Sequence, residues 1–185
     1  NDYLSARKRF SFEEVFYIQL SVSRERKNYQ SHRGYHIEVP PKTIDAFVER
    51  FPFTATGAQE RALATILEDF KRPYPMSRLL EGDVGSGKTA VAATTAFAAV
   101  SAKADARGVG SLQVAYMAPT EILATQHFEN FITYFKHLDI KIGLITGSGC
   151  RKYPSKVDRS GVTTISRTQL LKWVKEGDIS ILIGT

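Results

Sequence analysis

The spacing of apolar residues along the chain predicts helices and short strands in alternation. Near the N-terminus, apolar side chains recur at helical spacing from Phe12 to Leu20. Ser11 and Glu14 have the spacing of a capping box, in which the two side chains bond the free amides at the start of a helix. We therefore expect a first helix that begins at Ser11 and ends in the charged stretch at residues 24–27.

Two shorter helices are predicted next. Residues 35–39 are expected to form a short extended piece, and the apolar face of residues 43–50 predicts a helix. Thr56 and Gln59 have the spacing of a second capping box, which predicts a helix that continues to about Phe70.

A glycine-rich stretch lies at the centre of the chain, between an apolar run and an alanine-rich run. Residues 78–80 are typical of a short buried strand, and residues 89–100, which lack glycine and proline, predict a buried helix. Residues 82–89 between them follow the pattern G-x-x-x-x-G-K-T. Glycines let the backbone wrap an anion, and the N–H groups and helix dipole favour its negative charge. The order strand, loop and helix favours a phosphate-binding loop over a chance glycine-rich turn.

This loop supplies the candidate nucleotide-binding residues. The Lys88 ammonium would reach the β- and γ-phosphate oxygens, and the Thr89 hydroxyl would hold Mg²⁺. We therefore predict Lys88 and Thr89 as catalytic residues and Thr89 as the metal ligand. The predicted phosphate-binding set is Gly82, Asp83, Val84, Gly85, Ser86, Gly87, Lys88 and Thr89.

The second half of the chain continues the alternation. Strands are predicted at residues 112–117, 140–145 and 179–183, and helices at residues 121–136 and 166–176. This order predicts an α/β fold with a parallel sheet and flanking helices.

Caps and loops separate these elements. Thr120 and Ser166 are expected to cap the two helices, and Gly177 is expected to end the second one. Residues 102–111 are predicted to form a surface loop, and residues 148–162 a long mobile loop, because neither segment has regular apolar spacing.

Composition and charge narrow the possible partners. Hydrophobic residues make up 43% of the chain, but no apolar run approaches the ~20 residues that span a bilayer. Cys150 is the only cysteine, so an intrachain disulfide is excluded and a reducing cytosol is the expected compartment. The net charge is +6, and residues 136–175 carry nine Lys and Arg against two Asp. Such a basic segment indicates a polyanionic partner, although an ordinary solvated surface remains an alternative.

Several motifs, taken in order, resemble the first motor domain of superfamily 2 DNA helicases, and most closely the RecG-type branch-migration helicases. The helix at Phe12–Leu20 resembles the segment that joins the DNA-binding wedge of that family to its motor. The resemblance covers nearly the whole chain and implies a RecA-like P-loop NTPase fold. The motifs are Thr56–Gln59, Gly82–Thr89, Met117–Ala124, Gln126–Phe128, Thr146–Ser148 and Ile183–Thr185.

The resemblance implies roles for further residues. Gln59 would recognise adenine through its amide, although capping alone also explains it. Phe53 would stack on the base, although an aromatic residue there also suits a core. His127 is expected to be a packed helix residue. The residues implied to contact the DNA backbone are Pro119, Thr120, Thr146, Gly147, Gly184 and Thr185.

The implied function is an ATP-dependent DNA helicase that remodels stalled forks and Holliday junctions in recombination and repair. Sister translocases of the transcription-repair coupling or primosomal type, a small-molecule phosphotransferase and a nucleotide-binding scaffold remain alternatives. Residues 1–52 would form a helical linker and residues 53–185 the N-terminal part of the motor. The acidic Walker B motif is not found, so we expect this chain to be a piece of a longer protein and to be inactive alone. The resemblance implies that the complete protein is bacterial, cytosolic and monomeric.

Overall fold

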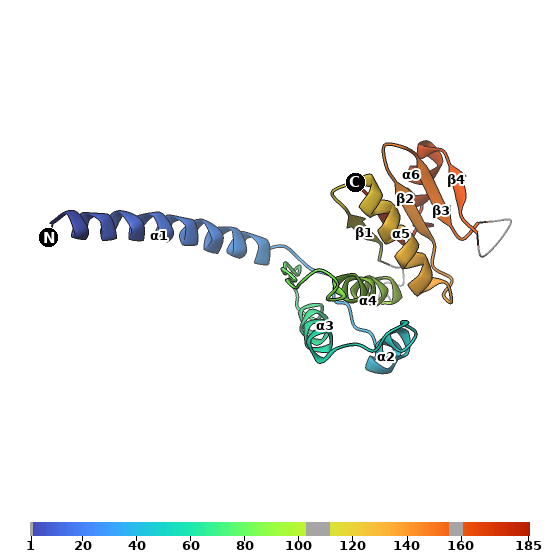
Figure 1. The fold of residues 1–185 in the computed structure, drawn as a ribbon, viewed down its shortest axis with the longest axis horizontal. Coiled ribbons are helices and arrows are strands. Elements are labelled where there is room, and N and C mark those ends of the chain that lie inside the picture. The colour runs from blue at the N-terminus through green and yellow to red at the C-terminus, as the bar shows by residue number, and fades with distance from the viewer. Residues whose placement is uncertain (1, 103–111, 156–160) are drawn as a thin grey trace.

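The computed structural model describes residues 2–102, 112–155 and 161–185. It contains a five-stranded sheet with helices on both faces and one long helix that extends away from the rest (Figure 1). The helices are α1 (Asp2–Gln30), α2 (Pro41–Val48), α3 (Gly57–Asp69), α4 (Lys88–Ser101), α5 (Glu121–Phe135) and α6 (Arg167–Lys175), and the strands are β1 (Val114–Met117), β2 (Ile142–Ile145), β3 (Cys150–Tyr153), β4 (Thr163–Ile165) and β5 (Ile181–Gly184).

The sheet has the strand order β1-β5-β2-β3-β4. Strands β1, β5 and β2 are parallel, whereas β3 and β4 run antiparallel to their neighbours. The α/β class with flanking helices is therefore confirmed, but the sheet is mixed and not purely parallel. In the parallel part, Gly184 pairs with Met117 on one side and with Ile145 on the other.

The predicted long loop at residues 148–162 is wrong, because it contains strand β3 (Cys150–Tyr153). Residues Cys150–Tyr153 turn back directly beside β2, and Cys150 and Tyr153 are buried. A short turn is enough to bring this segment antiparallel beside β2. Because strand pairing is made by backbone groups, the charged side chains between the two buried ones do not prevent it. Arg151 and Lys152 interrupt the apolar pattern, and the sequence therefore did not indicate this strand. Residues 156–160 lie outside the described structure.

The predicted strand at residues 78–80 is also wrong. The segment forms no strand, and Leu79 is 80% exposed. A strand exists only where a neighbour completes its hydrogen bonds, and none of the described strands pairs with this segment. The apolar run alone does not indicate whether such a neighbour is present.

The first helix begins earlier and ends later than its predicted bounds. Residues 2–10 contain neither glycine nor proline, so nothing stops the helix before Ser11, which lies inside α1 and is not an N-cap. None of the residues in α1 is buried. Among the described residues, no helix, not even this 29-residue one, is both long and apolar enough to cross a membrane.

Helix α2 is shifted from the predicted residues 43–50 to Pro41–Val48, and no strand forms at residues 35–39. The other helices and the remaining caps agree with the prediction. Thr56 and Gln59 form a complete capping box on α3. The hydroxyl oxygens of Thr120 and Ser166 accept hydrogen bonds from backbone amides in the first turns of α5 and α6. Gly177 has a φ of 80° just after α6, as a C-terminal stop requires. Residues 103–111 of the predicted surface loop lie outside the described structure.

Aromatic contacts hold the helices on one face of the sheet together. Phe47 of α2 stacks on Phe97 of α4 with ring centroids 4.2 Å apart, and it lies 5.0 Å from Phe135 of α5. Phe131 extends the cluster toward β1. A smaller core of Cys150, Leu170 and Ile179 lies apart from this cluster, and its Leu170 comes from α6.

We predict that Phe47→Ala lowers the free energy of unfolding by about 3–5 kcal/mol, because it removes a ring that is 2% exposed and leaves a cavity. Urea denaturation of the purified protein measures this change. Phe12→Ala is the matched control, because Phe12 is 68% exposed on α1. Equal losses for the two variants would contradict the predicted core.

Candidate nucleotide and DNA sites

The phosphate loop has the backbone shape that its glycines predict. Gly85 and Gly87 have φ values of 82° and 79°, a region that side chains with a Cβ rarely adopt. Gly87 is the N-cap of α4, and no side chain of the described residues caps it. The first turn of α4 therefore presents amide groups and the positive end of the helix dipole without a protein side chain bonded to them.

Gln59 holds this loop against α3. Its Oε1 accepts the Thr56 amide at 2.9 Å, which completes the capping box, and its Nε2 donates to the Ser86 carbonyl oxygen at 2.8 Å. A Cβ added to Gly87 would lie 2.2 Å from this Nε2, so only glycine allows the close approach. Capping by Gln59 is confirmed. Adenine recognition stays a prediction, and it would require the Gln59 side chain to give up one of these two hydrogen bonds for a bond to the base.

The Lys88 ammonium lies in the curve of the loop. It donates to the carbonyl oxygens of Gly82 and Asp83 at 2.6 and 2.7 Å, and its Nζ is 3.4 Å from the Ser86 hydroxyl oxygen. These acceptors are neutral, so a phosphate anion would compete for the ammonium with a charge-assisted bond. Thr89, which follows in the first turn of α4, is half-buried.

A buried ion pair anchors the segment that leads into the loop. Asp69 at the end of α3 is 5% exposed. Its carboxylate pairs with Arg78, two residues before Leu80, and with Arg72 at 2.9 Å. Asp69 was not among the residues that the sequence singled out. Its place among the apolar positions of α3 was the available signal, because an acid is rarely buried without a partner.

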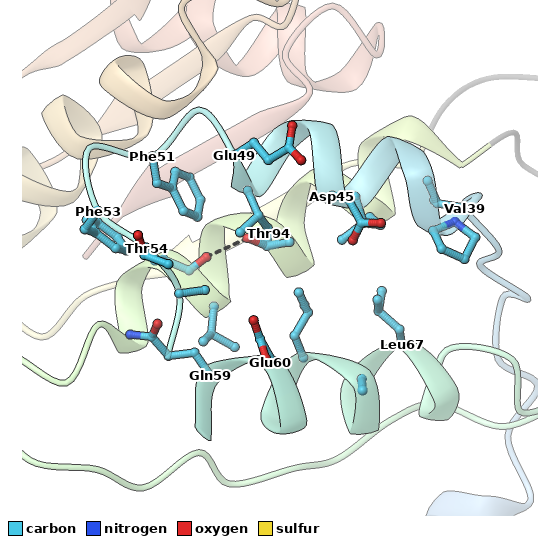
Figure 2. Close-up of a pocket in the computed structure, with 18 of the residues that line it drawn as sticks. Val39, Asp45, Glu49, Phe51, Phe53, Thr54, Gln59, Glu60, Leu67 and Thr94 are labelled. Carbon is cyan, nitrogen blue, oxygen red and sulfur yellow. Dashed lines mark hydrogen bonds between the residues drawn. The ribbon is translucent and has the colours of Figure 1, made fainter. Parts of the chain in front are cut away.

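Behind the loop, α2, α3 and α4 enclose a cavity of about 930 Å³. Figure 2 shows Gln59 and Phe53 at one end of it, with the Gln59 amide directed away from the cavity. Phe53 is 41% exposed and stacks on Phe51 at 5.5 Å. Phe53 is therefore accessible and is not a core residue.

The structure brings the predicted DNA-contacting residues together at one edge of the sheet. The Ala118 amide donates to the Gly184 carbonyl oxygen at 2.8 Å, and Gly184 also pairs with Ile145. Pro119 and Thr120 follow Ala118, Thr146 and Gly147 follow Ile145, and Thr185 follows Gly184. The ends of three parallel strands thus adjoin, as expected for an α/β sheet.

One predicted contact residue at this edge, Thr146, is buried. Thr146 is 6% exposed, and its hydroxyl bonds to Ser148 and to the Gly149 carbonyl oxygen within the turn. Gly147 beside it is exposed. A Cβ on Gly147 would lie 2.5 Å from Oε1 of Glu121, so the carboxylate of Glu121 rests against this turn. From the sequence, Glu121 was predicted only as the start of a helix and as part of the Met117–Ala124 motif, with no role of its own.

The two sites are separate, and the basic segment is only partly exposed. In Figure 1 the loop before α4 lies well away from the strand ends near the C-terminus. Lys152 is 7% exposed and lies 4.9 Å from the Trp173 ring centroid, so it is not part of a solvated basic face. His127 packs 5.0 Å from Tyr116, and burial lowers its pKa, which confirms that it is a packed helix residue.

Residues 56–185 match the family model described as DEAD/DEAH box helicase. The ATP-dependent DNA helicase RecG of Aquifex aeolicus is 38% identical over 178 residues, which are 96% of this chain and 20% of that protein. For the RecG of Bacillus subtilis the identity is 37% over 97% of this chain and 24% of that protein. A solved structure described as RecG bound to a three-way DNA junction has a TM-score of 0.77, with 32% identity, over 97% of this chain and 22% of that one. The resemblance seen in the motifs is confirmed, and the chain spans about a fifth of its relatives' length.

We predict that Asp69→Asn lowers the free energy of unfolding by about 1–3 kcal/mol, because the two guanidinium groups lose the negative charge of their partner and one of its two acceptor oxygens becomes a donor. Thermal denaturation measures the change. Glu68→Gln is the control, since the Glu68–Lys71 pair is exposed and such pairs contribute at most about 1 kcal/mol. A larger loss at Glu68 than at Asp69 would show that Asp69 does not anchor the loop.

Proposed function

Because the chain belongs to the DEAD/DEAH box helicase family, we propose that it is the ATP-binding part of a DNA helicase that remodels branched DNA. The observation that carries this proposal is the phosphate loop at the uncapped start of α4, with Lys88 inside it and Gln59 bonded to it. The similar solved structure is of RecG bound to a three-way DNA junction, and branched DNA is accordingly the substrate class proposed for this chain.

ATP binding follows from the loop and the first turn of α4. The amides at the start of α4 and the Lys88 ammonium would hold the β- and γ-phosphates, replacing the neutral carbonyl partners of Lys88. The described residues contain no group of three His, Cys, Asp or Glu that could hold a metal ion by itself. Mg²⁺ would therefore be held by the Thr89 hydroxyl together with phosphate oxygens, and there it would neutralise phosphate charge.

The base would lie at the Gln59 end of the cavity. Phe53 presents an exposed ring for stacking, and the Gln59 amide carries both a donor and an acceptor. Base recognition would break the hydrogen bond between Gln59 and the Ser86 carbonyl oxygen, so it would loosen the contact between α3 and the phosphate loop. This link supports the assignment of Gln59 as more than a capping residue.

DNA would bind through its backbone at the edge formed by the three strand ends. The start of α5 directs amide groups toward this edge, and Pro119, Thr120, Gly147, Gly184 and Thr185 surround it. Thr146 would act through its turn, because its hydroxyl is bonded internally. We also propose a bacterial cytosolic protein, monomeric when complete, in which residues 1–52 link a DNA-binding wedge to the motor that begins at residue 53.

Lys88→Ala is predicted to weaken Mg-ATP binding at least about tenfold, because a charge-assisted phosphate contact contributes roughly 1.5–3 kcal/mol. Calorimetric titration of the purified protein measures the affinity. Lys175→Ala, which removes an exposed lysine of α6, is the control. Equal affinity of folded wild type and Lys88→Ala would refute the nucleotide site.

Glu121→Gln is predicted to tighten binding to branched DNA about two- to fivefold, or roughly 0.4–1 kcal/mol, since the Glu121 carboxylate repels a phosphate at this edge. Glu129→Gln is the matched control, because it removes an exposed carboxylate two turns along the same helix. Fluorescence anisotropy at several salt concentrations measures both affinities. An equal gain in the two variants would mean that only net charge matters, and the proposed edge would lose its support.

A further inference from the structure

The cavity behind the phosphate loop extends well beyond the residues that the nucleotide would use. From the Gln59 end it continues between α2 and α3 to Val39 and Lys71. Its volume of about 930 Å³ is at the upper end of the range, ~300–1,000 Å³, that holds small organic molecules. A cavity of this volume admits a drug-sized molecule but not a complete helix.

The walls of this extension are apolar. Ile44 and Val48 of α2 face Leu63 and Leu67 of α3, and Val91 of α4 closes the far side. Thr94, the buried polar residue of this wall, donates its hydroxyl to the Ala90 carbonyl oxygen and has no free donor. An occupant would therefore need an apolar body, because the walls satisfy no polar group on it.

The mouth of the cavity carries negative charge. Figure 2 shows Asp45 on α2 and Glu60 on α3 at opposite sides of the space between the two helices, with Glu49 one turn further on, at the C-cap of α2. These three carboxylates form no hydrogen bond or ion pair with any residue in the described ranges. Lys71 is the single cation among the lining residues, and its ammonium is paired with Glu68 at 3.0 Å.

We propose that this cavity binds a small organic cation with an apolar or aromatic body. The body lies between α2 and α3, and the cationic group lies at the mouth beside Asp45 and Glu60. Anionic amphiphiles of the same shape are excluded by the carboxylates, and neutral ones bind without the electrostatic gain. The site is distinct from the phosphate loop and lies in the same cavity beyond the Gln59 end, which the base would occupy under the proposed function.

The test is a titration of the purified protein with three probes that share one body: naphthylbutylamine, naphthylbutanol and naphthylbutanoate. Isothermal calorimetry is expected to give the amine a dissociation constant at least about tenfold below that of the butanoate, with the alcohol between them. Saturating Mg-ATP is expected to leave the amine bound. Equal affinities of amine and butanoate, or complete displacement of the amine by Mg-ATP, would overturn the proposal.

Two sets of variants locate the binding. The triple change Asp45→Asn, Glu49→Gln and Glu60→Gln is expected to reduce the amine to the affinity of the alcohol, while alcohol binding is kept and shows that the protein is folded. Leu67→Trp and Ala64→Phe, which fill the cavity from α3, are expected to abolish binding of all three probes without loss of the cooperative thermal transition. Unchanged amine binding in either set would place the amine elsewhere and refute the site.

Discussion

The pairing of β5 on both of its edges is the constraint on which the proposed DNA edge depends. Strand β5 lies between β1 and β2 and satisfies its backbone groups on each side. Ile181 and Ile183 are fully buried in the aromatic core, and a shift by one residue would move them to the opposite face of the sheet. Gly184 ends the strand where a Cβ would lie 2.5 Å from the Ile145 carbonyl oxygen. The register and this close approach together place the ends of β1, β2 and β5 side by side.

The phosphate loop depends on a different kind of interaction. No described strand pairs with the segment before it, and side chains hold it instead. Gln59 bonds to the loop at the Ser86 carbonyl oxygen, and the Lys88 ammonium bonds to the carbonyl oxygen of Gly82 at the start of the loop. The Asp69–Arg78 ion pair holds the segment that precedes the loop. A small number of side-chain hydrogen bonds can be exchanged more easily than the many hydrogen bonds of a paired strand. The loop can therefore change shape when a phosphate oxygen replaces the carbonyl oxygens as the partner of Lys88.

Most features that depend on neighbouring residues were predictable from the sequence, although Ser11 proved not to be a cap. Several features that depend on distant residues were not predictable. The caps at Thr56, Thr120 and Ser166 were correct because their chemistry is complete within three residues. The strand predicted at residues 78–80 failed because pairing requires a partner from elsewhere in the chain. The β3 strand was missed for the same reason, since its neighbour β2, and not its own charged sequence, makes it a strand. Likewise, the role of Asp69 appears only when Arg78 is folded against it.

Helix α4 is the element that connects the two proposed sites. Its first turn carries Lys88 and Thr89, its side packs on α3 and α2, and its C-terminal half contacts β1 and α5. Strand β1 ends at Met117, directly before Pro119 and Thr120 of the proposed DNA edge. Because Phe97 of α4 is enclosed by Phe47 and Phe135, α4 cannot tilt without moving α2 and α5 as well. A tilt of α4 would therefore move α5 as well, and α5 begins directly after Thr120 of the proposed DNA edge.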